Sequence, residues 1–226
     1  MLRKLRVTPL KTADRILDTA RRLFNEQGEH NVSATDIALE LDISPGNLYY
    51  HFKGKDAIHL ALFEQLQREL VGLLGTPVTE PTLFSDNDDS PVLRSWLFLT
   101  VVLEKMLEYR YLYDDLTDLM HRYPTLNRGI QRISRLKRAA CETLIKELLG
   151  RHSATDERLA TLVNTMAMTL TFWFSWERMV NPNDSPEVLV HRGVLQLLST
   201  CAPYMGEEQQ SFYQECEILY RDMLAA

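Results

Sequence analysis

The stretch SATDIALELDISPGNLYYHFKGK (residues 33–55) predicts two short helices joined by a tight turn. Ser33, followed three residues later by Asp36, has the pattern of a capping box, and the positive end of a helix also favours the carboxylate. Ser44 followed by Pro45 begins the second helix, because a serine hydroxyl accepts a bond from a free N–H and proline needs no donor at the first helical position.

The spacing of apolar residues gives each of these helices a buried side. In the first helix the apolar residues recur at helical intervals, as Ala34, Ile37, Ala38 and Leu41. The second helix buries Leu48 and Phe52, which lie four residues apart, and Gly54 is expected to end it in a left-handed conformation. The side chains left outside are those of Pro45, Asn47, Tyr49, Tyr50, His51, Lys53 and Lys55, together with the bare backbone of Gly46.

Two further helices are expected to complete a small core. The preceding one has an apolar stripe formed by Ile16, Leu17, Ala20, Leu23 and Phe24, and it is expected to end at Gly28. The following one begins after Lys55 with Ile58, Ala61, Leu62, Phe63, Leu66 and Leu70. A short exposed helix that carries hydrogen-bonding groups and flat rings suits the major groove of DNA. The sequence therefore predicts DNA binding rather than catalysis.

The segment from Arg15 to Phe63, most closely in NLYYHFKGKD (residues 47–56), resembles the DNA-binding domain of tetracycline-repressor-type (TetR/AcrR) regulators. The rest of the chain resembles that family in its length and its all-helical pattern. The resemblance implies phosphate contacts near Ser33 and Thr35 and from Lys55. The full set of DNA contacts that it implies is Ser33, Thr35, Ser44, Pro45, Gly46, Asn47, Tyr49, Tyr50, His51 and Lys55. Alternatively, the two tyrosines cover the core and His51 satisfies a helix end; one tyrosine is expected to pack as much as it touches DNA.

Charge is distributed unevenly along the chain. Residues 1–56 contain nine Lys/Arg and eight Asp/Glu, whereas the remainder contains sixteen and twenty-three. Phosphate would repel this acidic remainder, so we expect it to lie away from the duplex. The first eleven residues have four basic side chains and no acid, which indicates either a basic arm that reaches DNA or a disordered tail. We divide the chain into an arm with a helix-turn-helix domain (1–56) and a helical effector-binding and dimerisation domain (57–226).

The remainder predicts an all-α domain without strands or repeats. The expected helices are 56–74, 90–113, 113–122, 123–150, 153–180, 185–206 and 207–224, with a loop rich in Pro, Ser and Asp at 76–90. Two stretches, 96–107 and 159–180, are apolar on nearly every side and must be covered by core, a partner subunit or a ligand.

The family resemblance implies a homodimer and a small-molecule effector. We expect the helices 159–180 and 187–204 to form the dimer interface, with Val194 and Leu198 in it. An apolar or aromatic effector is expected to contact some of Trp96, Met106, Tyr109, Tyr113, Met120, Met166, Phe172 and Trp173.

A basic run lies between Asp118 and Glu142, with no acid between them. It comprises Arg128, Arg132 and Arg135 at helical spacing, with Lys137 and Arg138 beside them. Such a run is usually a solvated helix face. The alternative is that it meets an anionic ligand, such as a fatty acid or its coenzyme A thioester.

Enzymes are the competing class, but the sequence has no H-E-x-x-H, C-x-x-C, G-x-S-x-G or phosphate-binding glycine motif. We predict no cofactor and no metal site. The three scattered cysteines indicate reduced thiols, and no apolar run approaches the ~18 residues that span a bilayer, so we expect a cytoplasmic protein. The predicted function is a sequence-specific transcriptional regulator of double-stranded DNA, a repressor released by a small apolar ligand. The alternative is a DNA-binding protein without an effector, whose C-terminal domain binds a protein partner.

Overall fold

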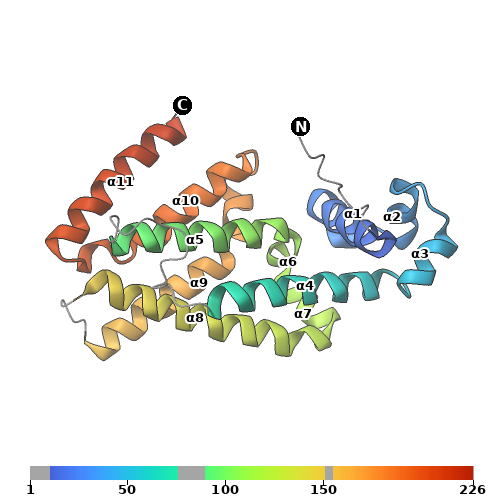
Figure 1. Cartoon of the computed structure of the whole chain (residues 1–226), viewed down its shortest axis with the longest axis horizontal. Helices are drawn as coiled ribbons and strands as arrows, with labels where there is room; N and C mark the ends of the chain where they lie inside the picture. Colours follow the sequence, from blue (N-terminus) through green and yellow to red (C-terminus); the bar gives the residue numbers. More distant parts are fainter. Residues whose placement is uncertain (1–10, 76–89, 151–154, 226) are drawn as a thin grey trace, which may run out of the picture. The chain divides into compact units, whose positions relative to one another are not determined.

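A computed structural model describes residues 11–75, 90–150 and 155–225 of the chain. Every regular element within these ranges is a helix, as the sequence predicted. The chain divides into two compact units, Met1–Gln65 and Leu66–Ala226, which we call unit 1 and unit 2 (Figure 1). The predicted basic arm lies outside the described residues except for its last position, as does nearly all of the predicted loop at 76–90.

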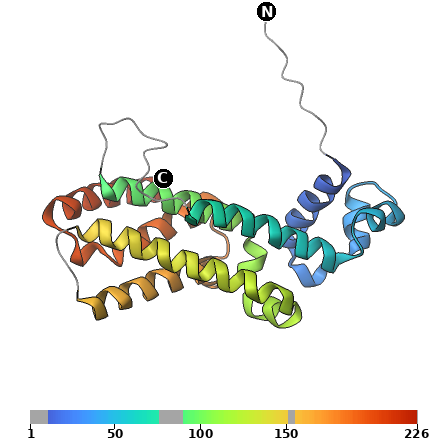
Figure 2. The same ribbon diagram turned by 60° about the horizontal axis from the view of Figure 1, so that its bottom comes forward.

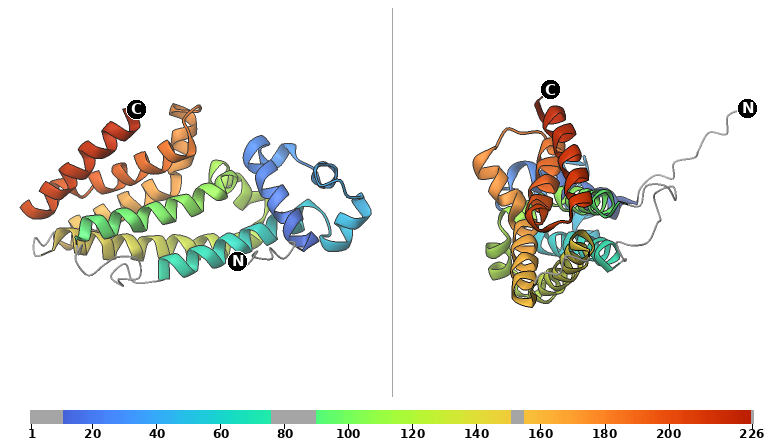
Figure 3. Two further views of the ribbon diagram at one scale, coloured as in Figure 1. Left: turned by 45° about the horizontal axis from the view of Figure 1, so that its top comes forward. Right: turned by 90° about the vertical axis from the view of Figure 1, so that its left-hand side faces the viewer.

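Unit 1 is a small three-helix core that continues into a fourth helix. Its elements are α1 (Thr12–Gln27), the 3-10 turn η1 (Glu29–Asn31), α2 (Ala34–Glu40), α3 (Pro45–His51) and the first part of α4 (Lys55–Gly75). The first three helices pack against one another (Figure 3). The stripe predicted for α1 is the set of residues that this helix buries, and Ile37, Leu48, Ile58 and Leu62 complete the core without any exposed surface.

The capping signals act as predicted. The Ser33 hydroxyl accepts a bond from the Asp36 N–H at 3.2 Å, and the Asp36 carboxylate accepts one from the Ser33 N–H at 2.8 Å. The hydroxyl of Ser44 accepts a bond from the N–H of Asn47 at 3.2 Å, at the start of α3. Each bond satisfies a backbone donor that the helix itself cannot pair.

The turns of unit 1 depend on three residues with positive φ. Gly28 ends α1 with φ 82°, and Gly54 precedes α4 with φ 123°. Asp42, in the turn between α2 and α3, has φ 53°, a conformation that aspartate adopts more readily than most residues. Leu41 and Phe52, which were predicted to be buried, lie at the ends of α2 and α3 and are only half-buried.

Unit 2 contains the rest of α4 and the remaining helices. These are α5 (Pro91–Glu108), α6 (Arg110–Asp114), α7 (Leu116–Arg122), η2 (Pro124–Leu126), α8 (Asn127–Leu149), α9 (Asp156–Val180), α10 (Pro186–Ser199), η3 (Ala202–Tyr204) and α11 (Glu207–Ala225). α8 packs along α9, α10 packs along α5, and α9 also contacts α6 and α10 (Figure 2).

Several predicted helices of unit 2 are shorter than expected. The helix predicted over 90–113 breaks at Tyr109, whose φ of −120° and ψ of 35° leave the helical region. The helix predicted over 123–150 opens as a 3-10 turn at Pro124, and α8 begins only at Asn127. The helix predicted over 185–206 ends at Ser199.

Close packing of three helices centres on Gly193 of α10. A Cβ at this position would lie 2.6 Å from Nε1 of Trp173 on α9 and 2.9 Å from Cδ1 of Leu103 on α5. The Trp173 indole is itself held, since its N–H donates to the Leu189 carbonyl at 2.8 Å. Among the described helices, none combines the length and apolar composition that a bilayer crossing requires.

Candidate nucleic-acid interface

One side of α3 is exposed to solvent, and the other is buried in the core of unit 1. Leu48 is fully buried, whereas Tyr50 is 80% exposed and Tyr49 is 47% exposed. The neighbouring predicted contacts are exposed as well: Ser44, Pro45, Gly46, Asn47 and His51. Asn47, Tyr50 and His51 thus present polar groups and rings from one short helix that is fixed by its cap and by Leu48.

The two tyrosines differ in their surroundings. The Tyr50 ring meets the His51 ring edge-on at a centroid distance of 5.1 Å, and both are exposed. Tyr49 is the more covered of the two, and its Cε1 would lie 4.0 Å from a Cβ at Gly54. Tyr49 is therefore the tyrosine with more of its ring covered by its own domain, and whether it packs as much as it touches DNA stays a prediction.

The predicted phosphate contacts on α2 lie at the start of that helix. Ser33 and Thr35 are both exposed. The Ser33 hydroxyl is already used in the capping box, where it donates to the Asp36 carboxylate at 2.6 Å. These hydrogen bonds hold the pKa of Asp36 below its usual value, so this carboxylate stays charged at neutral pH.

The two lysines beside Gly54 are placed differently. Nζ of Lys55 donates to the Glu29 carbonyl at 2.9 Å and pairs with the Glu29 carboxylate at 3.1 Å, which is itself 3% exposed. Lys53 is exposed. The pairing with Glu29 ties the start of α4 to η1, so Lys53 is the more available of the two for a phosphate.

The residues predicted to meet an effector fall into two groups. Six are buried in unit 2: Trp96, Met106, Tyr109, Tyr113, Met166 and Trp173. Met120 is half-buried, and Phe172 of α9 is 49% exposed, unlike Met166 and Trp173 of the same helix. The indole of Trp96 is satisfied internally, since it donates to the Tyr220 hydroxyl at 2.6 Å, which in turn lies 2.8 Å from Nδ1 of His191.

An apolar stripe on α9 remains uncovered, and we call it the outer face of α9. Its exposed residues are Met168, Phe172, Trp176, Met179 and Val180. In contrast, Val194 and Leu198 of α10 have no exposed surface. The prediction that these two residues lie in a subunit interface is wrong, because they belong to the core of unit 2.

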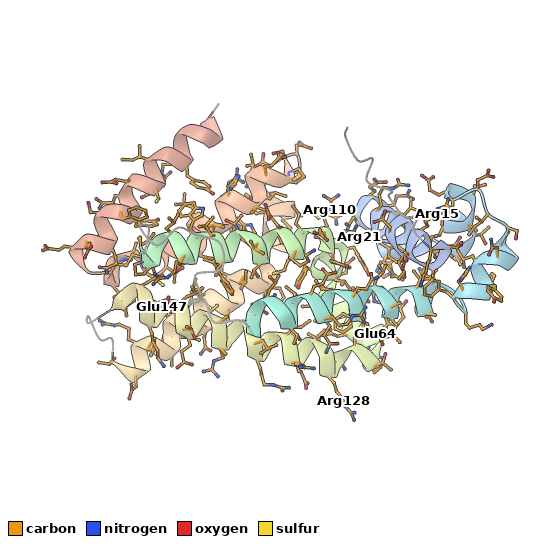
Figure 4. The ribbon with its side chains drawn as sticks, viewed as in Figure 1. Arg15, Arg21, Glu64, Arg110, Arg128 and Glu147 are labelled. Carbon is orange, nitrogen blue, oxygen red and sulfur yellow. The ribbon has the colours of Figure 1, made fainter. Side chains whose placement is uncertain are left out.

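The basic run on α8 is split between two environments. Arg128, Arg132, Arg135 and Arg138 are exposed, and Figure 4 shows Arg128 projecting outward from α8. Lys137 is only 1% exposed. The arginines therefore form the solvated face that the sequence suggested, but Lys137, which the sequence placed beside them, points into the core.

A helix-turn-helix unit followed by a larger all-helical unit defines a class of DNA-binding regulators. Two family models match the chain: "Bacterial regulatory proteins, tetR family" over residues 16–62, and the TetR model described as "Bacterial transcriptional repressor" over residues 65–213. The chain belongs to the TetR family of bacterial transcriptional regulators.

Individual relatives match only part of the chain. The regulator UidR of Escherichia coli K12 is 35% identical over 78 residues, which are 34% of this chain and 40% of UidR. The regulator SAB2452 of Staphylococcus aureus is 39% identical over 66 residues, 29% of this chain and 34% of that protein. The chain thus matches less than half the length of these curated relatives.

Solved structures show that the likeness extends to the whole fold. A TetR-family regulator from Marinobacter aquaeolei VT8 superposes with a TM-score of 0.80 at 24% identity, covering 93% of this chain and 99% of that one. A TetR regulator from Legionella pneumophila gives a TM-score of 0.62 at 16% identity, covering 86% and 99%.

Proposed function

We propose that this protein is a homodimeric repressor that binds a palindromic operator through α3 and releases it when a small apolar ligand enters unit 2. The observation that carries the proposal is the open side of α3, where Asn47, Tyr50 and His51 are exposed on a helix whose other side is closed by Leu48. The description of the model matching residues 65–213 as a bacterial transcriptional repressor supports repression. Such a protein acts where the chromosome is, in the cytoplasm.

The energetics of recognition favour a dimer. One short helix reads only a few base pairs, and each mismatch costs about 1–3 kcal/mol. Two copies that read half-sites on one face of the duplex multiply this discrimination. The outer face of α9 offers a second copy an apolar surface that unit 2 leaves exposed.

Release requires that the ligand prefer the conformation that does not bind DNA. A ~100-fold loss of operator affinity corresponds to about 2.7 kcal/mol of coupling free energy. The buried aromatic and methionine side chains of unit 2 are the groups we assign to ligand contact. α4 is continuous across the division after Gln65, so it is the segment along which a change in unit 2 would reach α3.

DNA recognition is tested by operator selection followed by titration of the labelled duplex at fixed salt. We expect Asn47→Ala and Tyr50→Ala each to weaken operator binding about tenfold or more, because a lost base contact costs roughly 1–3 kcal/mol. Binding to random duplex should change less. Gln27→Ala, at an exposed uncharged position of α1, is the matched control and should bind as the unaltered protein does. Equal operator preference in all four proteins would refute the assignment of α3.

The outer face of α9 also fits the second candidate, a DNA-binding protein without an effector whose unit 2 binds another protein. Screening small molecules for release of the bound operator separates the two. Release by a ligand supports the repressor; operator binding that no ligand alters, together with a heterologous protein bound at α9, supports the alternative.

A further inference from the structure

Lys137 occupies a position in α8 where an apolar residue would be expected. The buried side of this helix includes Ile133, Lys137, Ala140, Cys141 and Leu144, which follow one another at helical spacing. Lys137 is 1% exposed, although lysine is almost never fully buried unless it is paired. The exposed arginines of the same helix do not share this environment.

Within the described part of the chain, no carboxylate compensates the buried amine. Across the described ranges, the two most deeply buried carboxylates are already committed, Glu29 to Lys55 and Glu177 to Arg192. Lys137 itself has neither an ion pair nor a hydrogen bond within the part of the chain that the structure describes. Its Nζ instead lies over the ring of Tyr113, 4.7 Å from the centroid.

The other groups that face Lys137 are neutral. Tyr113 reaches it from α6, and the Cys141 thiol lies one turn further along α8. Burial raises the pKa of Cys141 to about 12 and also raises the pKa of Tyr113, so neither provides a negative charge at neutral pH. Burial lowers the pKa of Lys137 to about 7, because the charged form is poorly solvated there.

An unpaired buried cation is costly, and proteins usually supply a counter-ion. Among the described residues, none supplies that counter-ion to Lys137, which lies beside Tyr113 in the apolar interior of unit 2. We infer that Lys137 is the polar anchor of the effector site and that the effector is an apolar molecule with one carboxylate, which pairs with the Lys137 ammonium. This inference rests on the proposed ligand-controlled repressor and narrows the ligand to a class.

The number of charges limits the ligand further. A single ammonium, with a ring and a thiol as its neighbours, matches one negative charge and not several. A nucleotide-bearing thioester would bring several phosphates, and the arginines that could meet them lie on the exposed side of α8. A simple acid with an alkyl or aryl body therefore fits better than its coenzyme A thioester.

The test uses the full-length protein and pairs of probes that differ only in charge. Octanoate, dodecanoate and phenylacetate are compared with octan-1-ol, dodecan-1-ol and 2-phenylethanol by calorimetry at pH 7. We expect at least one acid to bind about 10- to 100-fold more tightly than its alcohol, as for a charge-assisted hydrogen bond. This preference should disappear in Lys137→Met and persist in Arg135→Met, which removes the same charge from the exposed side of the same helix.

A second measurement separates ligand recognition from a purely structural role. Without ligand, Lys137→Met should melt at or above the temperature of the unaltered protein, because an apolar side chain of similar length replaces an unpaired buried amine. A structural role over the Tyr113 ring predicts a lower melting temperature instead. In the unaltered protein, affinity for the acid should fall as the pH rises from 7 to 9, while affinity for the alcohol stays constant.

The outcomes are distinct. The inference is overturned if no acid binds better than its alcohol, or if Lys137→Met keeps the preference. It stands if the preference depends on Lys137. If the acid binds in this way but leaves operator affinity unchanged, the anchor is correct and the proposed ligand-controlled release is wrong.

Discussion

Lys53 and Lys55 lie on either side of Gly54, but their side chains have different surroundings. Lys55 holds the buried Glu29 carboxylate, whereas Lys53 projects into solvent. We expect Lys53→Met to weaken binding to all duplexes and to lower the slope of log affinity against log salt by about 1, as for one lost phosphate contact. Titrations at several salt concentrations measure this slope.

Lys55→Met is the matched comparison, with the same change in charge and shape. It leaves a carboxylate that is 3% exposed without its cation, so the main expected effect is on stability. Because Lys55 is itself 24% exposed, we expect a loss of about 2 kcal/mol in the free energy of unfolding rather than the full cost of a broken buried pair. A larger loss of salt slope in Lys55→Met than in Lys53→Met would reverse the two assignments.

The buried amine of Lys137 makes a second prediction, on pH. Its pKa is lowered from 10.5 to about 7 on folding, so between these values the unfolded chain binds a proton that the folded chain does not. Stability therefore rises with pH in this window, by roughly 1.4 kcal/mol per pH unit from this group. The free energy of unfolding of Lys137→Met should exceed that of the unaltered protein most at pH 7, and the gap should narrow toward pH 9. Urea titrations at several pH values measure the gap; a constant gap would contradict the neutral buried amine.

At the level of helices, Gly193 of α10 lies close to Leu103 of α5 and Trp173 of α9. Gly193→Ala should lower the free energy of unfolding by about 1–3 kcal/mol, because its Cβ would overlap Trp173 and Leu103. The indole has little freedom to move, since its N–H is bonded to the Leu189 carbonyl. This loss exceeds the gain of up to about 1 kcal/mol in helix propensity.

Gly72→Ala in α4 is the control for Gly193→Ala. No described residue outside the turns of α4 itself lies within 4 Å of a Cβ at Gly72, so the substitution should have only the propensity effect and stabilise the protein. Thermal unfolding of the two variants in parallel checks the difference. Equal shifts in both would mean that the packing at Gly193 relaxes without cost.

The sequence predicts the helices of unit 1 well because their signals are local. The caps at Ser33 and Ser44 and the stripe of α1 act through neighbours within a turn or two. The break at Tyr109 carries no glycine or proline, so it depends on packing that the sequence does not display. The positive φ of Asp42 could not be predicted from the sequence either, because aspartate also occurs in ordinary turns.

The candidate sites follow the same division between local and tertiary signals. The exposed side of α3 could be predicted because its inner residue, Leu48, is obvious from spacing. Lys137 was grouped with the arginines because it is adjacent to them in sequence. Its spacing of four residues from Ile133 was the available signal that it faces the core. Val194 and Leu198 were misplaced for another reason: apolar spacing does not distinguish a core from a subunit interface.

For the whole molecule, the question is which surface a second copy would cover in the proposed dimer. The outer face of α9 carries Met168, at 60% exposure, and Trp176, at 56%, and both lie on the side away from the core of unit 2. We expect Met168→Glu and Trp176→Glu to convert the dimer to monomers in sedimentation, because each would bury a charge in an apolar interface. Both variants should remain folded as monomers, since neither residue supports the core of unit 2.

Two comparisons make the α9 prediction specific. Ile218→Glu, at 61% exposure on α11, introduces the same charge elsewhere on unit 2 and should leave the dimer intact. Val194→Glu would disrupt the core and so unfold unit 2, which does not report on association. Because one α3 reads only one half-site, the two α9 variants should also lose operator affinity while they keep weak binding to random duplex. Dimers that survive both α9 substitutions would place the interface on another surface.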